Sequence, residues 1–121
     1  MKYLCLVHLE EARMAAVTGR ELAELDNESL DFDDEMRRRG HFIEAQALQP
    51  TRTATILRVR NGQVSTTDGP FIETKEQVGG FVLIEAADLN EALQVAAQIP
   101  VARYGAIEVR PVMELERTDL A

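Results

Sequence analysis

Hydrophobic residues gather in two short, nearly continuous segments, at 2–9 and at 80–86. Both are too short for a buried helix, and segments of this kind predict β-strands in the centre of a sheet. Residues 41–48 and 106–113 predict two further strands, in which polar side chains interrupt the apolar ones. These polar side chains belong to Glu44, Gln46, Glu108 and Arg110, and they favour the edges of the sheet. Pro111 also indicates an edge strand, since proline cannot donate a backbone hydrogen bond to a neighbour.

Two helices follow from capping signals and from the spacing of apolar residues. Thr18 begins a T-x-x-E capping box, and a core-facing stripe then continues at steps of three and four until Gly40 ends the helix. The residues of this stripe are Leu22, Leu25, Ser29, Phe32 and Met36. Asp88 begins a second segment with the same start signal, and Pro100 ends it.

Asn61 and Gly62 separate two further strand-like segments, 53–60 and 63–67. This dipeptide favours a tight β-hairpin, because both of its residues tolerate positive φ angles. The order of elements is then strand, helix, strand, hairpin, strand, helix, strand. Without the hairpin, this is the order of a ferredoxin-like βαββαβ unit. The sequence therefore predicts an α+β fold with an inserted hairpin, in a single domain over 1–121.

The predicted sheet has more apolar surface than two helices can cover. Two helices cover only one face of such a sheet, yet the segment 2–9 is apolar on both faces. One side of this strand carries Tyr3, Cys5, Val7 and Leu9, and the other carries Leu4 and Leu6. An uncovered apolar face predicts contact with another copy of the chain, so we expect a homodimer.

Composition and charge narrow the classes of function. The chain has 121 residues, of which 45% are hydrophobic and 28% charged, as in ordinary globular proteins. A net charge of −8 argues against nucleic acid as a partner, and the basic run 37–39 fits the end of a helix, where positive charge is favourable. The single cysteine, Cys5, excludes an internal disulfide. No segment is typical of a signal peptide or a membrane span, so we expect a cytoplasmic protein without a membrane partner.

Residues 68–81, DGPFIETKEQVGGF, are dense in turn formers and charged side chains. The first four are typical of a turn. Thr74 predicts a capping box and a short helical turn over 74–78, which Gly79 ends. Turn structure alone accounts for every residue type here. A functional interpretation stays open beside it, because the first amides of a helical turn point outwards and attract anions.

Residues 68–76 of this segment, called the corner below, carry residue types suited to acid–base chemistry and anion binding. Asp68 and Glu73 can exchange protons, and Lys75 adds a positive charge beside them. His8 ends the first strand, where it can either face a cavity or cap the sheet, and His41 is expected at the surface. No spacing is typical of a metal site and no nucleotide-binding motif occurs, so we expect no metal and no cofactor.

Four segments carry a family resemblance: MKYLCLV at the start, ALQP at 47–50, ETKEQVGGF at 73–81 and IEVRPV at 107–112. Together with DGPF at 68–71, they make the chain resemble the DGPF-type branch of the YCII-related family along nearly its whole length. The resemblance implies a bacterial protein of the dimeric α+β barrel group. It also implies acid–base chemistry by a His–Asp pair, as in some YCII-type relatives. The first predicted helix holds no histidine, so His8 and Asp68 are the substitutes for that pair.

Two hypotheses of function follow. The first is a cleft that binds a small anionic organic molecule and turns it over by acid–base chemistry, with Asp68 as general acid or base and His8 as its partner. The expected ligand contacts come from Phe71, Glu73, Lys75 and Arg110. The second is a non-catalytic module that contacts protein partners in transcriptional regulation, because DGPF-type domains resemble segments joined to sigma-factor-like regions.

Overall fold

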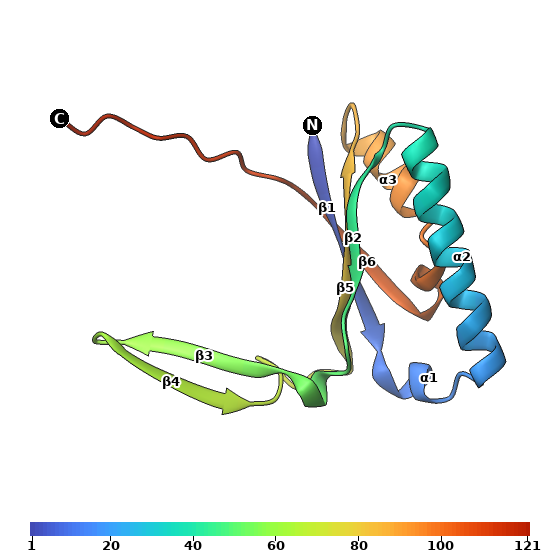
Figure 1. The fold of residues 1–121 in the computed structure, drawn as a ribbon, viewed down its shortest axis with the longest axis horizontal. Coiled ribbons are helices and arrows are strands. Elements are labelled where there is room, and N and C mark those ends of the chain that lie inside the picture. Colours follow the sequence, from blue (N-terminus) through green and yellow to red (C-terminus); the bar gives the residue numbers. More distant parts are fainter.

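A four-stranded antiparallel sheet organises the computed structural model, which describes residues 1–121 (Figure 1). Its strands are β1 (Lys2–Glu10), β2 (Phe42–Ala47), β5 (Glu76–Glu85) and β6 (Gly105–Pro111). They lie in the order β2-β5-β1-β6, with the two continuous apolar strands in the centre and the more polar strands at the edges. This order confirms the predicted ferredoxin-like α+β fold.

Three helices form the second layer, on one face of the sheet (Figure 1). They are α1 (Glu11–Ala15), α2 (Gly19–Arg38) and α3 (Leu89–Ala96), and short 3₁₀ turns cover Thr51–Thr53 and Pro100–Tyr104. The two long helices were predicted from their caps, whereas α1 has no side-chain cap and gave no sequence signal. No helix is long and apolar enough to cross a membrane.

The predicted helix caps are present. The Thr18 hydroxyl accepts a hydrogen bond of 3.1 Å from the amide of Glu21, and the Asp88 carboxylate accepts one of 2.9 Å from the amide of Glu91. Gly40 follows α2 with a φ of 80°, a conformation that glycine adopts without strain. These caps satisfy backbone groups that the helix ends would otherwise leave unpaired.

The core lies between the sheet and the helices. Tyr3 and Cys5 of β1 pack there in one cluster with Phe32 and Met36 of α2. Residues of the opposite parity point away from the helices, because side chains alternate along a strand. On that side Leu4 pairs with Leu83 and Leu6 pairs with Phe81 across the two central strands, and all four side chains are only half-buried. We call this side, with these four residues at its centre, the open face.

The hairpin consists of β3 (Thr55–Arg60) and β4 (Gln63–Asp68), which pair only with each other. Asn61 and Gly62 form its turn with φ angles of 53° and 75°, as the dipeptide predicted. The hairpin projects from the side of the sheet opposite the helices, and the C-terminal segment leaves β6 towards the same side (Figure 1).

The helical turn predicted over 74–78 is wrong. Residues 76–78 instead form the first part of β5 and pair with the end of β1, with Glu76 opposite Glu10 and Gln77 opposite Leu9. Pairing with β1 provides the backbone partners that a helical turn would have supplied, so tertiary contact overrides the local capping signal. Gly79 does not end a helix but lies where a register shift interrupts the pairing of β1 with β5.

Candidate functional site

A cleft of about 590 Å³ lies where the end of β1 meets the corner between β4 and β5. His8 contributes to it from the open face, and Ile56 from the base of the hairpin. The corner adds Pro70, Phe71 and Thr74. Seven of the fifteen lining residues are polar or charged, Glu76 among them, and the others are apolar or proline.

His8 is paired with a carboxylate at the edge of this cleft. Its Nε2 lies 3.0 Å from Oε1 of Glu108 on β6. The register of the two strands sets Glu108 opposite Leu6, two residues before His8, so both side chains lie on the open face. Arg110 extends this row, with its Nε 4.0 Å from Oε2 of Glu108.

The pairing divides the two nitrogens of the His8 ring between different roles. Nε2 is held by Glu108, which orients the imidazole ring. Nδ1 has no hydrogen-bond partner within the chain and is the nitrogen left for a bound molecule. The His8 side chain is 29% exposed and that of Glu108 47%, so the pair is open to a ligand.

Two hydrogen bonds shape the corner opposite His8. The Thr74 hydroxyl donates to the carbonyl of Glu76 at 2.6 Å, and the Gln77 side-chain amide donates to the carbonyl of Ile72 at 2.6 Å. Gly69 has a φ of 103°, which favours glycine, and its amide donates to the carbonyl of Ala54 at 2.8 Å. The corner is therefore tied both to itself and, through Gly69, to the residue that precedes β3.

The 3₁₀ turn on the other side of the cleft is held from α1. The Glu11 carboxylate accepts hydrogen bonds from the amide and the hydroxyl of Thr51, at 3.0 and 2.8 Å. This contact joins two segments that are 40 residues apart in the sequence. The short helix α1, which sequence analysis missed, thus helps to position a wall of the cleft.

The other candidate residues lie around the cleft in different ways. Phe71 lines it, with its ring 5.8 Å from the Arg58 guanidinium. Asp68 is exposed at the end of β4 and does not line the cleft, and the carboxylate that contacts His8 is Glu108. Lys75 and Glu73 are also exposed on the corner outside the lining, and the Lys75 Nζ lies 3.7 Å from a Glu10 oxygen. 

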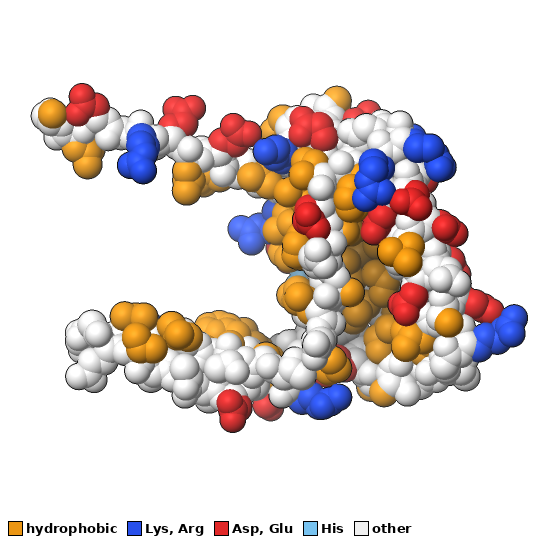
Figure 2. Space-filling view, in the orientation of Figure 1, with side chains coloured by type: hydrophobic (Ala, Val, Ile, Leu, Met, Phe, Trp, Pro, Cys, Tyr) orange, Lys and Arg blue, Asp and Glu red, His pale blue; other side chains and the backbone are white.

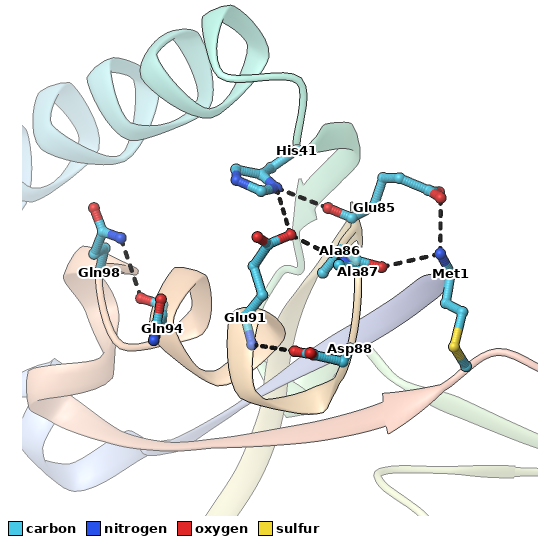
Figure 3. Close-up of polar contacts among 9 residues, drawn as sticks. All are labelled: Met1, His41, Glu85, Ala86, Ala87, Asp88, Glu91, Gln94 and Gln98. Atoms are coloured by element: carbon cyan, nitrogen blue, oxygen red, sulfur yellow. Dashed lines mark hydrogen bonds and ion pairs between the residues drawn. The ribbon is translucent and has the colours of Figure 1, made fainter.

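The second histidine has a structural position at the opposite end of the sheet (Figure 3). His41 Nδ1 lies 2.8 Å from the carbonyl oxygen of Glu85 and 3.9 Å from a Glu91 oxygen. Beside it, the amino terminus of Met1 donates to the Glu85 carboxylate and to the Ala86 carbonyl, both at 2.9 Å. The His41 side chain is 15% exposed, so it is partly buried rather than fully on the surface, because it contacts β5 and α3.

A second cavity, also of about 590 Å³, lies between α2 and the sheet. Figure 2 shows this hollow beside the helix, with hydrophobic side chains inside it. Its only charged lining residues are Asp26 and Asp33 of α2, and partial burial raises the pKa of the Asp33 carboxyl. No histidine lines it, so it lacks the proton-exchanging group of the first cleft.

Other titratable groups serve the fold. Burial raises the pKa of the Cys5 thiol to about 11, so this cysteine is a neutral core residue at physiological pH. A hydrogen bond from Arg103 lowers the pKa of Glu28 and ties α2 to the 3₁₀ turn before β6. No group of three histidine, cysteine or carboxylate residues is placed to hold a metal ion.

Comparison with known proteins adds a family. Residues 1–116 match the family model described as the YCII-related domain. An uncharacterized protein of Rhizobium meliloti (strain 1021) is 48% identical to the chain over 67 residues. The aligned stretch covers 54% of each protein, so the chain spans about half the length of the curated relative that it matches.

Proposed function

The chain belongs to the YCII-related domain family, as its DGPF corner indicated, and from this premise we propose that it binds a small organic acid in the cleft beside His8 and exchanges a proton with it. The observation that carries this proposal is the His8–Glu108 pair, 3.0 Å apart at the edge of a cleft that Ile56 and Phe71 line. Histidine is the side chain best suited to gain and lose a proton near neutral pH.

Each part of the cleft has a role in this proposal. Nδ1 of His8 exchanges the proton, and Glu108 stabilises the imidazolium that forms, the role that sequence analysis gave to Asp68. The apolar body of the ligand packs on Phe71 and Ile56. An anionic ligand is favoured by the positive charge of the imidazolium and of Arg110, whose guanidinium lies beside Glu108.

We further propose that the protein works as a homodimer through the open face. The chain exposes 8839 Å², about 2300 Å² more than the roughly 6500 Å² expected for a compact protein of 13.5 kDa. A stable interface buries about 800 Å² on each partner, so the excess surface is sufficient for one. The side chains at the centre of the open face are Leu4, Leu6, Phe81 and Leu83, which are the kind that an interface core requires.

The ligand proposal is tested by a thermal-shift screen of small carboxylates and phenols. A ligand that binds only the native state raises the melting temperature, so we expect some of these compounds to stabilise the protein. His8→Gln and Glu108→Gln should abolish the shift while leaving the unliganded melting temperature nearly unchanged, because both side chains are partly exposed.

The matched control is Glu44→Gln. Glu44 is a carboxylate on the other edge strand, opposite Leu83, and does not line the cleft. This variant should keep the ligand shift. The proposal is contradicted if no compound stabilises the protein, or if His8→Gln responds to the ligand as the wild type does.

A further inference from the structure

The β3–β4 hairpin carries an apolar face that nothing in the chain covers. Leu57, Val59 and Val64 are 60%, 53% and 64% exposed. Val59 and Val64 form a cross-strand pair, and Leu57 lies two residues from Val59, so the three share one face. A two-stranded hairpin is at best marginally stable by itself in water, which indicates that this face packs on something in the working protein.

The C-terminal segment, 112–121, also exposes hydrophobic side chains that nothing in the chain covers. Met113 is 81% exposed and Leu115 is 86% exposed. The segment and the hairpin extend as two arms on the same side of the sheet, one from each end of it (Figure 1). Hydrophobic side chains gather on the side of the hairpin that faces the C-terminal segment (Figure 2). Because the two arms of one chain are far apart, any contact between them requires two chains.

The charges of the two arms are complementary. The charged residues of the hairpin strands are Arg58, Arg60 and, at the base, Asp68, so the hairpin has a net positive charge. Within 112–121 the charged residues are Glu114, Glu116, Arg117 and Asp119, of which three are acidic. Arg58 and Arg60 alternate with Leu57 and Val59, so they lie on the other face of the hairpin and flank the apolar contact rather than form it. A twofold axis that joins the hairpin to the C-terminal segment brings arms of opposite net charge together, whereas one that joins hairpin to hairpin brings like net charges together.

We propose that, in the dimer, the Leu57–Val59–Val64 face of each hairpin packs on the C-terminal segment of the other copy. This inference rests on the homodimer proposed above and adds its arrangement. It also concerns the cleft, because Ile56 at the base of the hairpin and Phe71 just after it are both lining residues. Docking of the hairpin on the partner therefore holds one wall of the ligand site.

Disulfide trapping tests the arrangement. One chain carries Val59→Cys and a second chain carries Leu115→Cys, and the two chains have tags of different length. They are co-expressed and then oxidised. Both positions are exposed, so the substitutions leave the core intact, and the native Cys5 is buried and takes no part. The expected product is a disulfide that joins a Val59→Cys chain to a Leu115→Cys chain. Ser65→Cys, on the opposite face of the hairpin, should give little of it.

Two results would overturn the arrangement in a protein that sediments as a dimer. One is a predominant link between two Val59→Cys chains, and the other is the absence of any link. A monomer in sedimentation would overturn the arrangement together with the dimer, and failure of the ligand screen alone would leave both standing.

A charge placed on the hairpin gives a second measurement. Leu57→Lys should raise the dimer dissociation constant at least about tenfold. A lysine that replaces a desolvated interface side chain costs more than the 1.4 kcal/mol that this factor represents. Ser65→Lys adds the same charge on the opposite face and should change the dissociation constant much less. Equal effects of the two variants would contradict the packing of the Leu57 face.

Discussion

The pairing of His8 with Glu108 joins residues that are 100 positions apart in the sequence. Residue types indicated that His8 belongs beside the corner at 68–76, and it does line a cleft there. Its carboxylate partner was not predictable, because it depends on the register between β1 and β6. A candidate from a nearby turn, Asp68, was the more obvious choice in sequence, yet strand pairing sets Glu108 beside the ring.

A second prediction for a single residue is that the Cys5 thiol resists alkylation in the native protein. Burial raises its pKa to about 11, so almost no thiolate is present at pH 8 and reagent cannot reach it. Iodoacetamide should label Cys5 only as fast as the chain unfolds, and at once in denaturant. Because the native pKa lies above that of the unfolded thiol, the stability from this group is complete below pH 9 and is lost as the pH rises above that value. Rapid labelling of the folded protein at pH 8 would contradict this account.

The strands and the long helices were predictable because their signals are local and agree with tertiary contact. The caps at Thr18 and Asp88 and the turn at Asn61 each need only neighbouring residues. The segment 74–78 has a local signal too, but β1 offers its backbone a longer set of partners, and the strand forms instead. The helix α1 has neither a cap nor a buried residue, so no local pattern could reveal it.

One glycine controls how closely two of these elements approach. A Cβ on Gly105 would overlap the carbonyl oxygen of His8 and lie 2.9 Å from its carbonyl carbon, so β6 would have to move away from β1. We expect Gly105→Ala to destabilise the fold by about 1–3 kcal/mol, as overpacking does, and to weaken ligand binding through the displaced His8. Denaturant unfolding measures the stability and the thermal-shift assay measures the binding.

The matched control for this prediction is Gly19→Ala. A Cβ on Gly19 meets nothing within 4 Å, and the position begins α2, so alanine should be neutral or slightly stabilising. If Gly105→Ala were as stable as Gly19→Ala, the close approach of β6 to β1 would be wrong.

For the whole molecule, the open face is the feature on which the homodimer and the proposed packing of its hairpins both rest. Only 14 of the 121 residues are buried, and the central pairs Leu4–Leu83 and Leu6–Phe81 have no helix above them. Parity in the sequence predicted two apolar faces of β1 but could not tell which one meets the helices. The structure assigns Val7 to the covered side, where it is 5% exposed, and Leu6 to the open face.

Two glutamate substitutions should therefore have different effects. Val7→Glu buries an unpaired charge beneath the helices and should prevent folding, which circular dichroism and solubility would reveal. Leu6→Glu should leave a folded chain that dimerises poorly, since its charge meets the second copy rather than the core. A Leu6→Glu protein that fails to fold while Val7→Glu folds would reverse the assignment of the two faces.

Sedimentation equilibrium of the wild-type protein at micromolar concentration measures whether a second copy covers the open face. We expect the mass of a dimer, twice the 13.5 kDa of the chain. Leu6→Glu should shift this mass towards that of the monomer. A wild-type protein that sediments as a monomer at this concentration would contradict the proposed dimer, whatever the variants did.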